Sequence, residues 1–252
     1  PASWRSRVRI DVVTLFPGMF EGPMSESIIK RAQAAEVLDL RITDLRDYSQ
    51  DKHRKVNDRP FGGGAGMVIR AEVVFDCLSA MELAPGARVI LTDPQGKTFD
   101  QKLAIELSEA PQLVFLCGHY EGFDERVREH LVTDEISIGD YVLTGGELPA
   151  MVMIDSVVRL LPGAIGKIES THEDSFYAGL LDYPHYTQPA IYRGWEVPEI
   201  LRSGNHGAIA KWRREQALRR TFERRPDLLE TAPLTKEDLK FLKQHCGWVP
   251  PV

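Results

Sequence analysis

The sequence predicts an α/β fold, with a mostly parallel sheet and helices on both faces, followed by a small all-α domain. Short apolar or β-branched runs alternate with stretches of helical spacing as far as Leu161, which is typical of parallel βαβ units. From about Leu180 the chain has no strand-like run and its apolar spacing is helical. A polar stretch without periodicity separates the two regions. We therefore expect an α/β domain over 1–165, a linker over 166–179 and an α-helical domain over 180–252.

The first strand is expected over 8–16, a β-branched run that Pro17 and Gly18 end, and a helix follows over 19–35. A second strand, over 37–42, leads into a polar segment and then into a glycine-dense loop at 60–67. Such a loop is mobile or lies close to a ligand. The alternation then resumes, with strands expected over 88–92, 112–116 and 133–138 and helices over 71–83, 99–109 and 147–161.

Composition restricts the class of protein. The chain has 252 residues, 43% hydrophobic and 27% charged, so a core can form without disulfides or metals. Cys77, Cys117 and Cys246 are widely spaced, which argues for a reducing compartment and against a disulfide framework or zinc site. No apolar run reaches the ~18 residues of a membrane helix, and no signal peptide precedes Val8. We expect a cytoplasmic protein with no membrane association, in which residues 1–7 form a loose extension.

Two glycine clusters directly follow expected strands. One runs from Cys117 to Gly122 and the other from Ile138 to Glu147, and each carries a tyrosine and an acid. Glycine lets the backbone approach a ligand closely, and ligand sites of α/β proteins lie at the carboxyl ends of strands. Together with the turn at 93–96, these clusters predict a pocket made of three loops. Tight turns without a ligand are the alternative.

Two other glycine motifs do not match nucleotide-binding signatures. Gly96-Lys97-Thr98 resembles the end of a P-loop, but that motif needs glycine at position 91, where this chain has Leu91. The loop at 62–66 follows Pro60 rather than a strand, so it is not a dinucleotide fingerprint. The sequence also lacks a metal-ligand cluster and a nucleophile elbow. Nucleotide hydrolysis and hydride transfer are therefore disfavoured.

Ordered motifs from Val8 to about Leu229 identify a known family. They are Leu15-Phe16-Pro17, DRPFGGG at 58–64, YEGFDERV at 120–127, SIGDYVL at 137–143, GGELPA at 145–150, EDSF at 173–176, PHYT at 184–187 and SGNH at 203–206. With these motifs the chain resembles the bacterial tRNA (guanine-N1)-methyltransferases of the TrmD family, which belong to the knotted SPOUT superfamily. One departure is His119, where the family commonly has arginine.

The resemblance implies a trefoil knot at the C-terminal end of the α/β domain, which general topology rules would have rejected. It also implies that S-adenosyl-L-methionine binds in a bent shape in the three loops, its adenine among backbone groups of 138–143. The implied cofactor-binding residues are Pro94, Gly118, Tyr120, Glu121, Gly122, Ile138, Gly139, Asp140, Tyr141, Val142, Leu143, Gly145 and Gly146. The implied substrate is the guanosine immediately 3′ of the tRNA anticodon, methylated on N1 by a homodimer whose active sites form between subunits.

N1 of guanine becomes a good nucleophile only when a base removes its proton, and the charge that develops on O6 needs a cation or donors. By resemblance Asp174 is that base and Arg159 that cation. From the residues alone, Asp174 could be a solvated linker residue and Arg159 a partner of Asp155 on its own helix. Glu121 either holds the cofactor's positive end or caps the helix after Gly122. The family's magnesium dependence adds Mg²⁺ as a candidate, although the sequence has no dedicated carboxylate cage.

A net charge of −6 does not suggest a nucleic-acid binder, but one segment does. Residues 211–225 contain seven basic and two acidic side chains. On a helix, Arg213, Arg220 and Arg224 fall within about 40° of one another, so one side can meet phosphates while another packs. An ordinary solvated helix is the alternative. We expect tRNA contacts from these three arginines and from three residues of the family motifs, His185, Asn205 and His206.

Two other functions stay open at this level. One is a knotted methyltransferase that modifies the ribose 2′-OH of an RNA, and the other is a non-catalytic RNA-binding module that keeps the knot for stability. The presence of methyl transfer separates the module from the enzymes, and the methylated atom separates the two enzymes.

Overall fold

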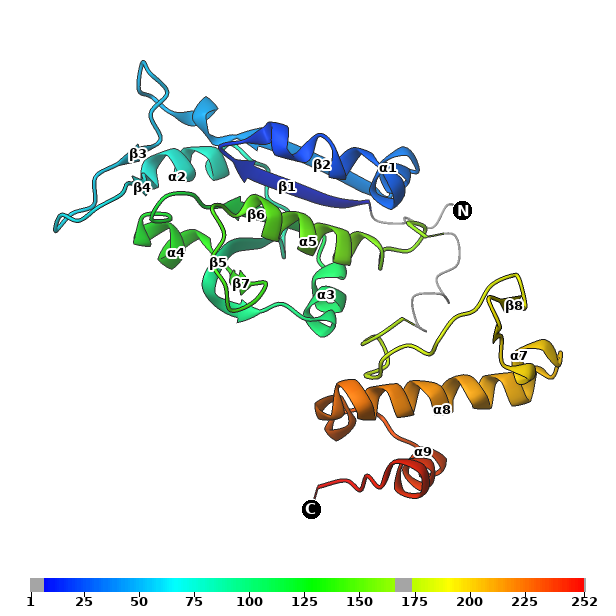
Figure 1. The fold of residues 1–252 in the computed structure, drawn as a ribbon. Coiled ribbons are helices and arrows are strands. Elements are labelled where there is room, and N and C mark those ends of the chain that lie inside the picture. Colours follow the sequence, from blue (N-terminus) through cyan, green and yellow to red (C-terminus); the bar gives the residue numbers. More distant parts are fainter. Residues whose placement is uncertain (1–6, 166–173, 252) are drawn as a thin grey trace. The chain divides into compact units, whose positions relative to one another are not determined.

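The computed structural model describes residues 7–165 and 174–251 (Figure 1). It contains two compact units, Pro1–Ile168 and Glu169–Val252. The division falls inside the segment predicted as a linker, of which residues 166–173 lie outside the described residues. Within the two described ranges, no helix has the length and apolar character needed to cross a membrane.

The N-terminal unit is built on a five-stranded parallel sheet, which confirms the predicted α/β class. Every residue of the central strand β6 is buried, as expected for a strand covered on both faces. β5 extends beyond its predicted end because it bulges between Thr92 and Lys97 and then pairs again with β7. The strands are β1 (Val8–Thr14), β2 (Leu38–Asp44), β5 (Arg88–Thr98), β6 (Gln112–Cys117) and β7 (Asp134–Ser137), in the order β2-β1-β6-β5-β7.

Helices cover both faces of this sheet. On one face α1 (Ser27–Ala34), α3 (Gln101–Ser108) and α5 (Glu147–Val158) contribute to one hydrophobic core, and on the other α2 (Ala71–Ser79) and α4 (Glu125–Leu131) contribute to a second. Successive residues of β1 supply both cores, since Val12 packs in the first and Val13 in the second.

Two further local details of the N-terminal unit differ from the sequence prediction. The helix expected over 19–35 begins only at Ser27, after two 3-10 turns, Pro17–Phe20 and Pro23–Ser25. Pro23 fixes its own φ and lacks an N–H, and Ser27 has a φ of 51°, so a continuous helix cannot form. In addition, two short strands, β3 (Asn57–Asp58) and β4 (Val68–Ile69), pair antiparallel at the base of the glycine-dense loop.

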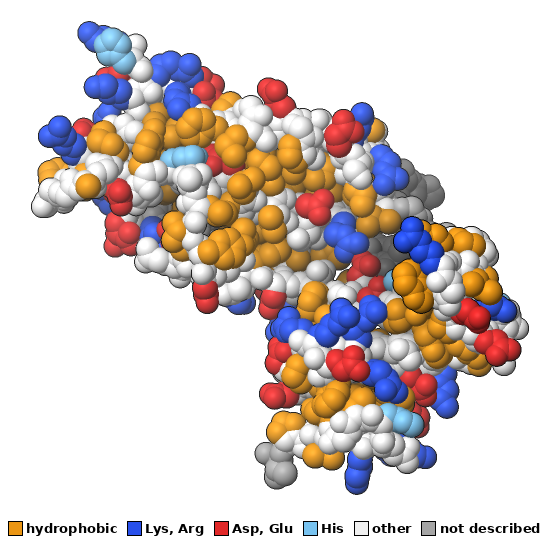
Figure 2. Space-filling model, in the orientation of Figure 1, with side chains coloured by type: hydrophobic (Ala, Val, Ile, Leu, Met, Phe, Trp, Pro, Cys, Tyr) orange, Lys and Arg blue, Asp and Glu red, His pale blue; other side chains and the backbone are white. Residues whose placement is uncertain are grey.

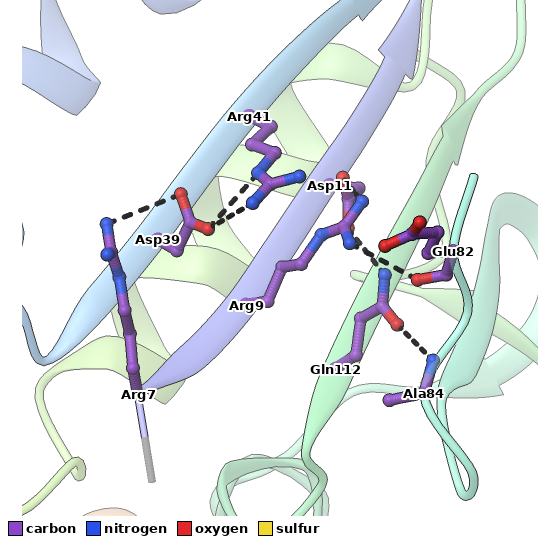
Figure 3. Close-up of polar contacts among 8 residues, drawn as sticks. All are labelled: Arg7, Arg9, Asp11, Asp39, Arg41, Glu82, Ala84 and Gln112. Atoms are coloured by element: carbon purple, nitrogen blue, oxygen red, sulfur yellow. Dashed lines mark hydrogen bonds and ion pairs between the residues drawn. The ribbon is translucent and has the colours of Figure 1, made fainter. Parts of the chain in front are cut away.

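A polar cluster lies near the amino-terminal ends of β1 and β6 (Figure 3). Asp11 is only 1% exposed; its carboxylate lies 2.8 Å from Arg9 Nε and accepts a hydrogen bond of 2.7 Å from Gln112 Nε2. On the neighbouring strand, Asp39 accepts a hydrogen bond of 2.7 Å from Arg41. These partners offset the free-energy cost of burying the Asp11 carboxylate, so the role of this cluster is structural.

The C-terminal unit is mostly helical and has a small core. Its long helix α8 (His206–Arg224) packs with α7 (Glu199–Arg202) and α9 (Lys236–Phe241), and two further turns lie at Pro226–Glu230 and Leu242–Cys246. The core consists of Leu180, Leu218, Leu229 and Leu242, with partly buried neighbours.

The expectation that no strand follows Leu180 is wrong at one place. β8 (Ile191–Tyr192) and β9 (Trp195–Glu196) form an antiparallel hairpin. Arg193 and Gly194 have positive φ angles of 54° and 84°, which is the backbone of a two-residue type I′ turn. Strands of two residues are too short to produce a detectable alternation in the sequence.

Candidate active site

The bulged segment of β5 and the loops after β6 and β7 surround one cavity of about 250 Å³ at the carboxyl ends of β6 and β7. This is where ligands bind in α/β sheets. Residues from all three predicted loops line it, together with Pro149 near the start of α5. The structure therefore brings together segments that are up to about fifty residues apart in the sequence.

Most of the residues expected to bind a cofactor line this cavity. They are Pro94, Gly118, Tyr120, Glu121, Gly122, Ile138, Gly139, Tyr141, Val142, Leu143, Gly145 and Gly146. Asp140 does not line it and is exposed. Sequence reasoning did not assign a binding role to several other lining residues: Thr92, Asp93, Gln95, His119, Phe123, Ser137, Thr144 and Pro149. Asp93, Gln95, His119 and Thr144 lie within the three predicted loops, and that position was the available signal.

Gly146 is required because backbones approach each other closely. A Cβ at this position would lie 2.8 Å from Cys117 Cα and 2.9 Å from Gly118 N. Its own N–H donates to the carbonyl of Gly118 at 2.9 Å. The start of α5 is thus docked directly onto the loop after β6, and no side chain fits between them.

The glycine-dense loop also reaches the rim of the cavity. A Cβ at Gly66, whose φ is 89°, would lie 2.5 Å from Glu121 Cγ, and the backbone N–H of Glu121 donates to Met67 O at 2.9 Å. Glu121 therefore lies over this loop. It does not cap α4, because the side chain of Asp124 accepts from Arg126 N and is the N-cap. That excludes capping as the explanation for Glu121.

Charge inside the cavity is partly compensated. Asp93 pairs with Arg128 at 2.9 Å, and the same guanidinium reaches Glu125 and Glu135. Burial alone would lower the pKa of Arg128, but its hydrogen bonds and charge interactions with Asp93 and Glu135 together outweigh burial, and the pKa is raised. Burial, reinforced by Glu147, raises the pKa of the Cys117 thiol well above its usual value. Cys117 is therefore a protonated packing residue and not a nucleophile.

Asp174 and Arg159, the expected catalytic pair, belong to different units. Arg159 is half-buried and directly follows α5, where its backbone N–H donates to Asp155 O at 3.3 Å. Asp174 is half-buried at the beginning of the second described range. It lines a further cavity of about 250 Å³ within the C-terminal unit, together with Tyr183, Arg213 and Arg214.

The predicted tRNA-contacting residues are engaged to different extents. Arg213 is exposed and its guanidinium lies 4.8 Å from the centre of the Tyr183 ring, whereas Arg220 donates to Asp182 O at 3.3 Å. Arg224 is exposed near the end of α8, and His206 is exposed at its start.

Two further polar residues of this group make local contacts. Asn205 is the N-cap of α8, and its side chain accepts from Ala208 N at 3.1 Å. His185 Nε2 lies 2.7 Å from Asp182 Oδ2, and its ring lies 4.6 Å from that of Tyr183. An aromatic ring, a histidine and an arginine thus lie together, the combination that stacks on unpaired bases.

Comparison with known proteins decides the family. A family model described as tRNA (Guanine-1)-methyltransferase TrmD matches residues 8–231. The chain belongs to this family. Relatives named tRNA (guanine-N(1)-)-methyltransferase include one from Geobacillus kaustophilus, 56% identical over 94% of this chain and 98% of that protein. Another, from Desulforamulus reducens, is 58% identical over 93% of this chain and 94% of its own length. A third, from Staphylococcus carnosus, is 56% identical over 94% and 97%.

The family match extends over the whole cavity, because the matched residues 8–231 include every residue that lines it. Among the described residues, no group of three or more His, Cys, Asp or Glu side chains is arranged to hold a metal ion.

Proposed function

We propose that this chain transfers a methyl group from S-adenosyl-L-methionine to N1 of the guanosine immediately 3′ of the anticodon in tRNA. The observation that carries the proposal is the three-loop cavity in a chain of the TrmD family. Most of the residues that line it are glycines or carry uncharged side chains, which suits a ligand that is recognised by shape and by backbone hydrogen bonds.

The residues present fit this donor. A cavity of about 250 Å³ with glycines at the points of closest approach leaves room for a folded nucleoside against the backbone of 138–143. Glu121 at the rim offers a carboxylate for the positive end of the donor. When bound, S-adenosyl-L-methionine supplies a methyl group activated by its sulfonium. The protein orients that methyl group and excludes competing nucleophiles.

Asp174 and Arg159 would prepare the base. Asp174 takes the proton from guanine N1, and the freed electron pair forms the new N–C bond as the bond between methyl carbon and sulfur breaks. Arg159 stabilises the negative charge that develops on O6 during proton removal. Support for these roles comes from the family resemblance. On this scheme the C-terminal unit supplies the base and the N-terminal unit supplies the cation.

A homodimer and a trefoil knot belong to the same proposal. α5 buries one side in the core but exposes Leu148 and Val152 to 50% and 46%, and Phe16 and Met19 are exposed in segments before α1. Figure 2 shows hydrophobic side chains gathered over the face of the N-terminal unit where α5 lies in Figure 1. A second copy would cover this face through an isologous contact. The knot is supported by the close approach of Gly146 to Thr92 and Gly118, which brings the last loop against β5 and the loop after β6.

The C-terminal unit would hold the tRNA as a small all-α domain apart from its hairpin. Exposed Arg213 and Arg224 on α8 offer cations to phosphates, and the ring of Tyr183 offers a stacking surface. A tRNA substrate also fits the cytoplasmic location that the sequence predicts. Mg²⁺ stays a candidate through the family resemblance alone.

Mapping the methyl group tests the proposal directly. Wild-type protein is incubated with labelled donor and a tRNA whose anticodon is followed by guanosine, and the modified nucleoside is identified by mass spectrometry. We expect N1-methylguanosine, and Asp174→Asn should lose turnover while it retains tRNA affinity. Methyl on a ribose 2′-OH would instead support the knotted 2′-O-methyltransferase. No transfer by wild-type protein would support the non-catalytic module.

A further inference from the structure

Glu147 is a buried carboxylate that the proposed chemistry does not use. It is the first residue of α5, is 1% exposed and lies just behind the wall of the cavity. Its Oε1 accepts a hydrogen bond of 2.6 Å from Thr14 Oγ1, and its Oε2 lies 2.7 Å from His119 Nε2. One carboxylate thus joins the end of β1, the loop after β6 and the start of α5.

Both partners are needed to keep this charge buried. A desolvated carboxylate is strongly unfavourable unless hydrogen bonds satisfy it, and the amino terminus of α5 adds only a modest favourable field. Thr14 donates to one oxygen and His119 lies against the other, so the removal of either partner leaves the carboxylate under-compensated. The backbone positions of both partners are therefore coupled to that of α5.

The imidazole of His119 is fixed on a second side. Its ring lies 4.6 Å from that of Phe16, tilted by 58°, and the guanidinium carbon of Arg46 lies 5.4 Å from the centre of the Phe16 ring. The side chain is 15% exposed and lines the cavity. A histidine held both by this ring contact and at Nε2 has little conformational freedom, so it anchors the loop 118–122.

That loop holds a backbone conformation that needs an anchor. Tyr120, the next residue, has a φ of 60°, in the left-handed region that residues with a side chain rarely adopt. Such a conformation persists only where the surroundings over-determine it. Here the backbone bonds Glu121 N–H to Met67 O, 2.9 Å, and Gly122 N–H to His119 O, 3.0 Å, hold one side, and the His119 side chain holds the other.

The third loop is shaped around the same pair. A Cβ at Gly145 would lie 2.5 Å from Glu147 Oε2 and would collide with the His119 ring. Gly145 therefore leaves the space that the histidine and the carboxylate occupy. Two of the three loops around the cavity take their conformation from this contact.

We propose that Thr14, Glu147 and His119 form a positioning network that holds the loop 118–122 in its donor-binding conformation. The inference rests on the proposed function and assigns no contact with the reacting atoms to Thr14 or Glu147, which act through His119. On this proposal a residue at position 119 serves when it can donate to Glu147, which an arginine side chain could also do.

Calorimetry with S-adenosyl-L-homocysteine, the demethylated product, tests the network in the full-length chain. Glu147→Gln and His119→Ala should each weaken this affinity about tenfold or more, the scale expected when a buried charged hydrogen bond is lost. His119→Arg should stay within about threefold of wild type because the guanidinium replaces the donor. tRNA affinity should change less than about twofold in all three variants, since the network lies within the N-terminal unit.

A merely structural role gives a different pattern. It would lower the thermal midpoint together with the affinities for product and for tRNA, and His119→Arg would not restore product binding selectively. That result overturns the proposal. Wild-type product affinity in Glu147→Gln and His119→Ala overturns it as well. If Glu147→Gln does not fold, Thr14→Val, which keeps the shape of Thr14, should still weaken product binding severalfold, and an unchanged affinity there counts against the network. Should wild-type protein bind neither donor nor product, the proposed function fails; amide exchange over 118–122 still tests the network, because it must speed up in His119→Ala and not in His119→Arg.

Discussion

The two units build their candidate sites from different materials. In the N-terminal unit most residues that line the cavity are glycines or carry uncharged side chains, with glycines where segments meet, while in the C-terminal unit the exposed surface of α8 carries arginines. Local packing fixes the shape of such a cavity, and added atoms damage it. A charged surface responds instead to salt and pH. The proposed donor site and the proposed RNA site should therefore fail under different perturbations.

The largest effect is expected from one added methyl group. Gly146→Ala places a Cβ 2.8 Å from Cys117 Cα, and since backbone cannot move aside cheaply, affinity for S-adenosyl-L-homocysteine should fall about 100-fold or more. tRNA affinity should persist. Gly22→Ala is the matched control, because Gly22 has open space around its Cβ position and a negative φ. Calorimetry and a tRNA-binding assay measure both; wild-type product binding in Gly146→Ala would break the contrast.

A smaller effect is expected at the polar cluster of the N-terminal unit. Asp11→Ala leaves Arg9 and Gln112 without their buried acceptor and should lower the free energy of unfolding by about 3–5 kcal/mol. Asp39→Ala, on the same face, removes the more exposed pair with Arg41 and should cost about 1 kcal/mol or less. Urea unfolding followed by circular dichroism compares the two. Equal losses in the free energy of unfolding would mean that burial does not determine how much each of these ion pairs contributes to stability.

The C-terminal unit should show an acid transition linked to Asp238. Burial would raise the pKa of Asp238, but two hydrogen bonds from Arg214, of 2.7 and 3.1 Å, the charge of Arg214 and the hydrogen bonds with Thr235 together outweigh burial and lower the pKa. Because the folded-state pKa is the lower one, this stabilisation is complete above the unfolded pKa and is lost as pH falls through the folded value. Thermal midpoints should therefore drop below about pH 4, and less steeply in Asp238→Asn. Asp227→Asn, at an exposed pair, serves as control; the same flattening there would contradict the assignment.

The smallest effect concerns salt. tRNA affinity should fall with ionic strength, and Arg224→Ala should reduce the magnitude of the log–log slope by about 0.7–0.9 without a change in thermal midpoint. Binding of S-adenosyl-L-homocysteine in the three-loop cavity should respond far less to ionic strength. Arg220→Ala provides the comparison, because Arg220 donates to Asp182 O and its loss should lower stability as well. A flat tRNA response to salt would remove α8 from the interface.

Much of the N-terminal unit could be predicted from its sequence because its strands are long enough to show an apolar run, and its glycine clusters directly follow those strands. The cavity followed from that order. The Thr14–Glu147–His119 contact could not be predicted, since its members are 133 and 28 residues apart and no local pattern links them. The hairpin at Arg193 was missed because its strands are two residues long. The pairing of Arg214 with Asp238 likewise depends on tertiary packing, which the helical spacing of α8 does not reveal.

The register of β1 has a consequence for how the chain acquires its structure. Arg9 pairs with Gln112 and Val13 with Leu116, so β1 pairs on this side with a strand that is made about a hundred residues later. A topology with such distant partners folds slowly, because a large loop must close before the pairing is rewarded. Until β6 emerges, the apolar edge of β1 has no partner on that side. Nascent chains of this protein should therefore depend on chaperone protection in the interval between the synthesis of β1 and the synthesis of β6.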